Sequence, residues 1–131
     1  DIADILNLSN VDFNKLRVRV SVDGSIILHE KFRGKSTYLK TIQSIKELKI
    51  KFGWVAINTI LVHETKNDIL LMSKQFKDLD INHWALIIPR GDIGHEKLKN
   101  KDDLEYINDT VRAIYGNSYS LWKLFYLAQQ Q

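Results

Sequence analysis

Residues 54–62, WVAINTILV, form an almost unbroken apolar run that is interrupted only by Asn58 and Thr59. Residues 83–89, HWALIIP, form a similar run. Runs of this kind are typical of parallel strands whose faces are covered by helices. Residues 15–22, KLRVRVSV, alternate between apolar and polar side chains, which predicts a strand with one buried face. That face carries Leu16, Val18, Val20 and Val22.

Segments with helical spacing separate the three predicted strands. The apolar stripe over residues 36–52 ends before Gly53, a residue type that is common at helix C-termini. Further helices are predicted over residues 67–79 and 102–115, and a terminal helix is predicted over residues 116–131. This alternation predicts a parallel α/β sheet with three βα units, either doubly wound or curved as an arc of a barrel. Three strands are few for a complete sheet, so we expect part of a larger one.

The chain has 131 residues, the size of one domain spanning residues 1–131. Its 44% hydrophobic and 27% charged residues are typical of a globular protein. The net charge of +3 is spread along the chain, so no specific nucleic-acid partner is expected. No apolar run approaches the length of a membrane span. Because the chain begins with Asp1 and shows no signal-peptide pattern, we expect a cytoplasmic piece of a longer protein.

The sequence contains no cysteine. Disulfides, thiolate zinc sites, thiol nucleophiles and iron–sulfur clusters held by this chain are therefore excluded. Common phosphate-binding and hydrolase motifs are absent as well. A small nucleotide-binding α/β domain remains one alternative, because Arg90 precedes the glycines Gly91 and Gly94. A non-catalytic interaction module is another, with a docking surface near Trp84, Trp122 and Tyr126.

A His-Glu pair follows each predicted strand: His29-Glu30, His63-Glu64 and His95-Glu96. Parallel α/β folds bind ligands at the carboxyl ends of their strands, so three imidazoles could meet there around a divalent metal ion. The offsets from the strand ends differ, and both residue types are common in exposed loops. Chance is therefore the favoured explanation, and no metal site is assigned.

Four short segments have a characteristic order and spacing: SVDG at 21–24, His29 followed by FRG at 32–34, INT at 57–59 followed by Asn67, and Pro89 followed by Gly91. Taken in this order, they resemble the second half of the barrel of radical S-adenosylmethionine (radical SAM) enzymes. The peptide-modifying branch of that family is the most similar. The similarity covers about three fifths of the chain, from Val20 to Gly94.

The resemblance implies a partial (β/α)6 barrel, to which this chain would contribute three βα units followed by an extra C-terminal helix. Members of the family bind a [4Fe–4S] cluster through Cys-x3-Cys-x2-Cys after the first strand. One electron from the cluster cleaves S-adenosylmethionine, and the resulting radical abstracts a substrate hydrogen. Because the first three βα units and their cysteines are absent here, the chain resembles the carboxyl-terminal portion of such an oxidoreductase, not competent alone. An excised domain of a full enzyme, a split subunit and a degenerate remnant are the three alternatives.

By resemblance, the S-adenosylmethionine site would include Ser21, Asp23, Arg33, Asn58, Ile88 and Pro89. Ser21 would lie near the ribose or the methionine moiety, and Arg33 would reach the carboxylate. Asn58 would contact the ribose, while the backbone around Ile88 and Pro89 would line the adenine. The implied partners are the missing amino-terminal half-barrel, in the same or a separate chain, and a peptide or small-molecule substrate. An unpaired edge at the first strand also predicts a homodimer.

Overall fold

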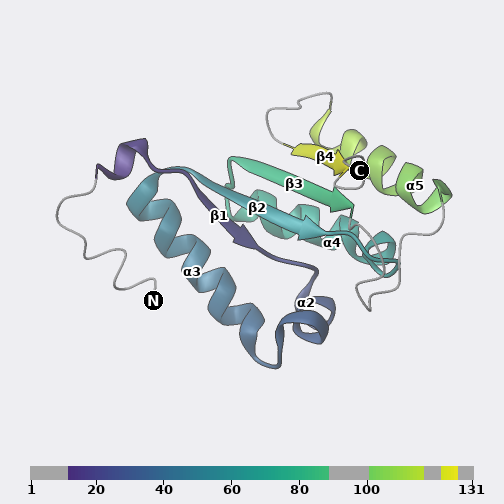
Figure 1. Ribbon diagram of the computed structural model, residues 1–131, viewed down its shortest axis with the longest axis horizontal. Coiled ribbons are helices and arrows are strands. Elements are labelled where there is room, and N and C mark those ends of the chain that lie inside the picture. The colour runs from purple at the N-terminus through teal and green to yellow at the C-terminus, as the bar shows by residue number, and fades with distance from the viewer. Residues whose placement is uncertain (1–11, 89–100, 117–121, 127–131) are drawn as a thin grey trace.

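In the computed structural model, residues 12–88, 101–116 and 122–126 are described. Four parallel strands form one sheet in the order β1-β2-β3-β4 (Figure 1). They are β1 (Val18–Ser21), β2 (Val55–Ile60), β3 (His83–Ile88) and β4 (Trp122–Tyr126). The strand order follows the chain order without reversal, which is the arrangement in an arc of a βα barrel. The predicted α/β class with parallel βα units is confirmed.

The helices connect the strands much as the sequence predicts. They are α3 (Thr37–Phe52), α4 (Thr65–Asp78) and α5 (Lys101–Tyr115). Gly53 ends α3 with a φ of 70°, a left-handed conformation that suits glycine. Two elements were not expected: a short 3-10 helix, η1 (Phe13–Lys15), and the helix α2 (Ile26–Arg33) between β1 and α3. Within the described ranges, no helix is long and apolar enough to cross a membrane.

The core lies between the sheet and the helices that follow its strands. Ile57 of β2 and Trp84 of β3 are completely buried, as are Ile45 of α3, Phe76 of α4 and Ile107 of α5. The rings of Phe76 and Trp84 meet edge to face, with their centroids 4.8 Å apart. The core therefore packs three helices against one face of the sheet. This packing fixes the position of the carboxyl ends of the strands.

The predicted terminal helix over residues 116–131 is wrong for residues 122–126, which form β4 and pair with β3. Residues 117–121 and 127–131 of that prediction lie outside the described residues. The apolar spacing of Trp122 and Phe125 fits a helix, but Trp, Phe and Tyr also favour strands. The backbone groups along the edge of β3 supply hydrogen-bond partners, and this tertiary pairing overrides the local pattern.

Candidate functional site

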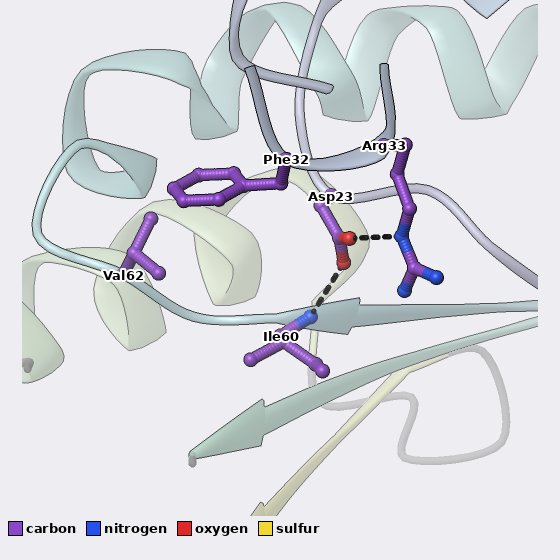
Figure 2. A pocket seen from close by; sticks show the side chains of 5 residues that line it. All are labelled: Asp23, Phe32, Arg33, Ile60 and Val62. Carbon is purple, nitrogen blue, oxygen red and sulfur yellow. Dashed lines mark hydrogen bonds and ion pairs between the residues drawn. The ribbon is translucent and has the colours of Figure 1, made fainter. Parts of the chain in front are cut away.

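The turn after β1 places a carboxylate at the carboxyl edge of the sheet. Asp23 is 5% exposed, and its Oδ2 accepts a hydrogen bond from Nε of Arg33 over 2.6 Å. Its other oxygen, Oδ1, accepts from the backbone N–H of Ile60 over 3.2 Å (Figure 2). Asp23 therefore joins the last residue of α2 to the last residue of β2, so both elements are held at fixed positions around it.

Close packing at the next two residues shapes this turn. A Cβ atom on Gly24 would lie 2.4 Å from Cβ of Leu28, so only glycine fits there without displacing α2. The backbone N–H of Ser25 donates to Oδ2 of Asp68, and the Ser25 hydroxyl donates to Oδ1 of the same carboxylate over 2.6 Å. Asp68 lies in the first turn of α4, so these bonds pin the β1–α2 turn to the following βα unit.

His29 supports Asp23 from inside the fold. The backbone N–H of Asp23 donates to Nδ1 of His29 over 3.2 Å, so the neutral imidazole carries its proton on Nε2. His29 is 1% exposed, and its Nε2 has no hydrogen-bond partner in the described part of the chain. The Tyr38 ring packs edge-on against the imidazole, with centroids 5.8 Å apart. Burial lowers the pKa of His29, because a charged imidazolium at this position would lack the water that solvates it outside the fold.

A cavity of about 260 Å³ opens beside this network and is lined by Asp23, Phe32, Arg33, Ile60 and Val62. The Arg33 side chain is 40% exposed, and its Nε is occupied by Asp23. Its two terminal nitrogens point away from that carboxylate (Figure 2) and have no partner among residues 12–88, 101–116 and 122–126. A guanidinium held in this way can bind a carboxylate or phosphate through two parallel hydrogen bonds.

The other predicted cofactor residues divide into two groups. Ser21 is exposed at the end of β1 and stands in register with the half-buried Asn58 of β2. These two therefore lie at the same sheet edge as Asp23 and Arg33. Ile88 ends β3, and its side chain packs against the core, which leaves its backbone as the part that could face a ligand. Pro89 lies outside the described residues.

A second polar cluster joins α4 to α5. Asp103, 4% exposed, lies in the first turn of α5 and binds His63 Nδ1 over 3.1 Å and Lys66 Nζ over 3.0 Å. The hydrogen bond from Lys66 is the main reason that the pKa of Asp103 is lowered. His29 and His63 thus serve different networks, and among the described residues no three potential ligands converge as a metal site. His95 lies outside those residues, and the metal hypothesis gains no support.

Sequence reasoning missed several residues of the site. Phe32, Ile60 and Val62 line the cavity, and Asp68 anchors the turn, but nothing in their local sequence indicates these contacts. The sequence singles out His29 as a possible metal ligand and as part of the family resemblance, but not as the partner of the Asp23 backbone. Leu28 and Phe32 are apolar and four residues apart, and Ser25 precedes them. This helical spacing is a signal that could have located α2.

The docking surface predicted near Trp84, Trp122 and Tyr126 cannot include Trp84. Trp84 is completely buried, and its Nε1 donates to the Thr59 hydroxyl over 2.9 Å. Trp84 therefore belongs to the core and offers no surface to a partner. The glycine pair Gly91 and Gly94 and the neighbouring Arg90, which carried the nucleotide-binding alternative, lie outside the described residues.

No protein-family model and no curated protein matches the chain. Among solved structures, the fold is similar to that of a radical SAM methyltransferase from Sphaerobacter thermophilus, with a TM-score of 0.69 and 13% sequence identity. The similarity covers 96% of this chain and 38% of the methyltransferase chain. The fold of this chain is therefore similar to that of part of this methyltransferase, and the chain spans well under half of its length.

Proposed function

We propose that this chain is the carboxyl-terminal half of a radical SAM barrel of the peptide-modifying branch, and that its sheet edge binds part of S-adenosylmethionine. The observation that carries the proposal is the pair formed by Asp23 and Arg33. The buried carboxylate fixes Nε of the guanidinium, Arg33 lines the cavity, and its two terminal nitrogens have no partner in the described part of the chain. This cavity lies where βα barrels bind their ligands, at the carboxyl ends of the strands.

The described residues fit the cofactor in the following way. Arg33 would bind the methionine carboxylate, because a positioned guanidinium matches a carboxylate bidentately. Ser21 and Asn58, side by side in register, offer a hydroxyl and an amide to the ribose hydroxyls. The backbone at Ile88 would face the adenine. S-adenosylmethionine, when bound and reduced in such enzymes, supplies the radical that abstracts hydrogen; the part of this chain is to bind and orient it.

The residues do not fit an iron–sulfur cluster, because the sequence has no cysteine. We therefore assign the cluster ligands to the missing amino-terminal half and derive no step through the cluster on this chain. The described part of β1 pairs only with β2, so its other edge is the place where that half would continue the sheet. In the absence of that half, the same edge would pair two copies. We expect a dimer whose population increases with concentration in analytical ultracentrifugation.

Two ligands that differ in the methionine carboxylate test the proposed role of Arg33. S-adenosylhomocysteine carries the amino-acid group, whereas 5′-methylthioadenosine ends in a thioether and lacks it. Titrated into the 131-residue chain and followed by NMR, S-adenosylhomocysteine is expected to bind more tightly than 5′-methylthioadenosine. The Arg33→Gln variant should lose about tenfold in affinity for the first ligand and little for the second, because one charge-assisted interaction is removed.

The matched control is Arg112→Gln, which removes an equal charge from an exposed position on α5. It should leave both affinities at the wild-type level. Equal affinity of the wild-type chain for the two ligands, or equal effects of the two arginine variants, would contradict the proposal.

A further inference from the structure

Two arginines stack on one tryptophan at the other end of the same sheet. The guanidinium carbon of Arg17 lies 4.9 Å from the centroid of the Trp54 ring, and that of Arg19 lies 5.7 Å from it. Both arginines are exposed, and Trp54 is half-buried. The ring holds two exposed cationic side chains beside each other, which limits their conformations before any ligand arrives.

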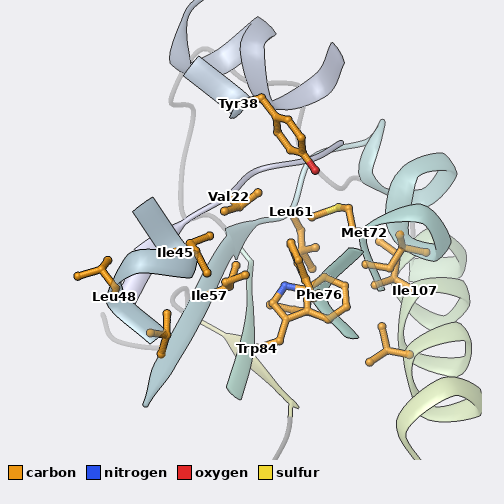
Figure 3. Close-up of a cluster of buried hydrophobic side chains, with 14 of the residues drawn as sticks. Val22, Tyr38, Ile45, Leu48, Ile57, Leu61, Met72, Phe76, Trp84 and Ile107 are labelled. Atoms are coloured by element: carbon orange, nitrogen blue, oxygen red, sulfur yellow. The ribbon is translucent and has the colours of Figure 1, made fainter. Parts of the chain in front are cut away.

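These side chains project from the face of the sheet opposite to the one on which α3, α4 and α5 pack. Val18 and Val20 pack against the core, so Arg19 and Ser21, which alternate with them along β1, face the opposite side. The register aligns Arg19 with Ala56 and Ser21 with Asn58. Figure 3 shows the helix side chains gathered on the other face, around Ile57 and Trp84. In a closed βα barrel, the face turned away from the helices is the lumen.

Neither arginine has an acidic partner in the part of the chain that the structure describes. Nη1 of Arg19 donates to Oδ1 of Asn58 over 3.5 Å, a long contact with a neutral group. Among the described residues, Arg17 contacts Trp54 and has no other polar or charged partner. Enclosing two guanidinium groups in a lumen is costly unless an anion accompanies them. Guanidinium pairs bind carboxylates and phosphates because their planar forks match those groups.

We propose that Arg17 and Arg19, stacked on Trp54, bind an anionic group of the substrate, a carboxylate or a phosphate, inside the barrel. Asn58 contacts Arg19 and lies in register with Ser21, so this anion site adjoins the proposed cofactor site on the same face. The inference rests on the proposed function, because this face is a lumen that holds substrate only in a closed barrel. The anion contacts themselves come from Arg17, Arg19 and Trp54 and are already present in this chain. It restricts the substrates to acidic ones, such as a peptide with a carboxylate side chain or a phosphorylated small molecule.

The test uses the 131-residue chain labelled with ¹⁵N and follows the Trp54 indole N–H and the Arg Nε–H resonances by NMR. The probes are succinate, inorganic phosphate and neutral succinamide, each at one ionic strength held constant with sodium chloride. We expect saturable shifts at Trp54 and Arg19 with at least one of the two anions, and none with succinamide. Saturation by succinate indicates a carboxylate substrate, and saturation by phosphate indicates a phosphorylated one.

Arg19→Gln and Arg17→Gln should each weaken this binding about tenfold, because each removes a charge-assisted interaction. Arg112→Gln is again the matched control and should bind as the wild type does. Both lumen positions are exposed, so these variants should fold, and dispersed NMR spectra of each variant would verify that. Shifts that stay linear in the wild type, or that survive unchanged in Arg19→Gln, would overturn the inference.

The cofactor role of Arg33 and the anion site at Arg17 and Arg19 can be contradicted independently of each other. Arg19→Gln should keep the wild-type discrimination between S-adenosylhomocysteine and 5′-methylthioadenosine, whereas Arg33→Gln should lose it and still show anion shifts at Trp54. Loss of the ligand discrimination in the wild type, with anion binding intact, contradicts the cofactor role alone. Intact discrimination without anion binding contradicts the substrate site alone.

Discussion

The backbone N–H of Asp23 donates a hydrogen bond to Nδ1 of His29 over 3.2 Å. This bond ties the start of the β1–α2 turn to the interior of α2, so the Asp23 carboxylate faces both Arg33 and the end of β2. It also requires a neutral imidazole, since a protonated Nδ1 would be a donor facing a donor. A buried histidine therefore positions the residue on which the proposed cofactor site depends.

The stability of the fold should depend on pH through His29. Its pKa is lowered from 6.5, so its contribution to the free energy of unfolding is complete above pH 6.5 and is lost as the pH falls through the folded-state pKa. His29→Asn provides an amide oxygen that accepts the same bond without titrating. Urea unfolding of the wild type between about pH 7.5 and pH 5 should show a decrease in stability that His29→Asn reduces.

His63→Asn is the control for this pH effect, because the His63 side chain is 58% exposed. Its stability should decrease more steeply over the same range than that of His29→Asn. The lowered pKa values of Glu64 and Asp103 give a loss of the same sign, but below about pH 4.5, where carboxylates protonate. An unchanged slope in His29→Asn would show that the imidazole does not carry the effect.

Gly24→Ala should destabilise the fold more than Gly53→Ala does. The new Cβ at position 24 would clash with Leu28, and we expect a loss of about 3 kcal/mol as in overpacked cores. At Gly53 nothing lies within 4 Å of a new Cβ, so the cost is left-handed strain alone, about 1 kcal/mol. Thermal and urea unfolding measure both, and equal losses would contradict the close packing of the turn.

Ser25 and Asp68 should be energetically coupled. Ser25→Ala removes one hydrogen bond to Asp68 and should cost about 1 kcal/mol, whereas Asp68→Ala also leaves the Ser25 N–H without its partner and should cost about 2 kcal/mol. In the double variant the losses should fall short of the sum by at least about 0.5 kcal/mol. A double-mutant cycle by urea unfolding measures this, and additive losses would indicate independent sites.

Thr59 should be required for the packing of Trp84. Its hydroxyl donates to the Val22 carbonyl over 2.6 Å and accepts from the Trp84 indole over 2.9 Å. Thr59→Val keeps the shape but leaves both buried groups unpaired, so we expect a loss of about 2–3 kcal/mol. Thr59→Ser keeps the hydroxyl and should lose only about 1 kcal/mol from the missing methyl group. Similar losses in the two variants would contradict this role.

The strands of the sheet could be predicted because their signals are local and strong. The run from Trp54 to Val62 has no periodicity that a helix surface would need, and Gly53 marks the end of the helix before it. β4 could not be predicted in this way. Residues 122–126 satisfy a helical and an extended pattern equally well, and the edge of β3 decides between them. α2 was missed because it is short and begins directly after the Gly24-Ser25 turn.

Part of the candidate site was also accessible from the sequence. Ser21, Asp23, Arg33 and Asn58 could be selected because they follow predicted strands or match a family pattern, and they meet at one sheet edge. Asp68, which anchors the turn, could not be selected. Asp68 is 43 residues from Ser25 in the chain, and local patterns carry no information about such a contact.

The sequence by itself determined the βα alternation, the parallel direction of the sheet and the absence of thiolate ligands. Periodicity and composition are properties of residues that are close together in the sequence, so they can be recognised without a structure. Only the tertiary structure decided that Asp23 holds Arg33 and is itself held by His29, and that Arg17 and Arg19 share Trp54 on the face opposite the helices. Those relationships depend on strand register and helix packing, which bring together residues that are distant in the chain.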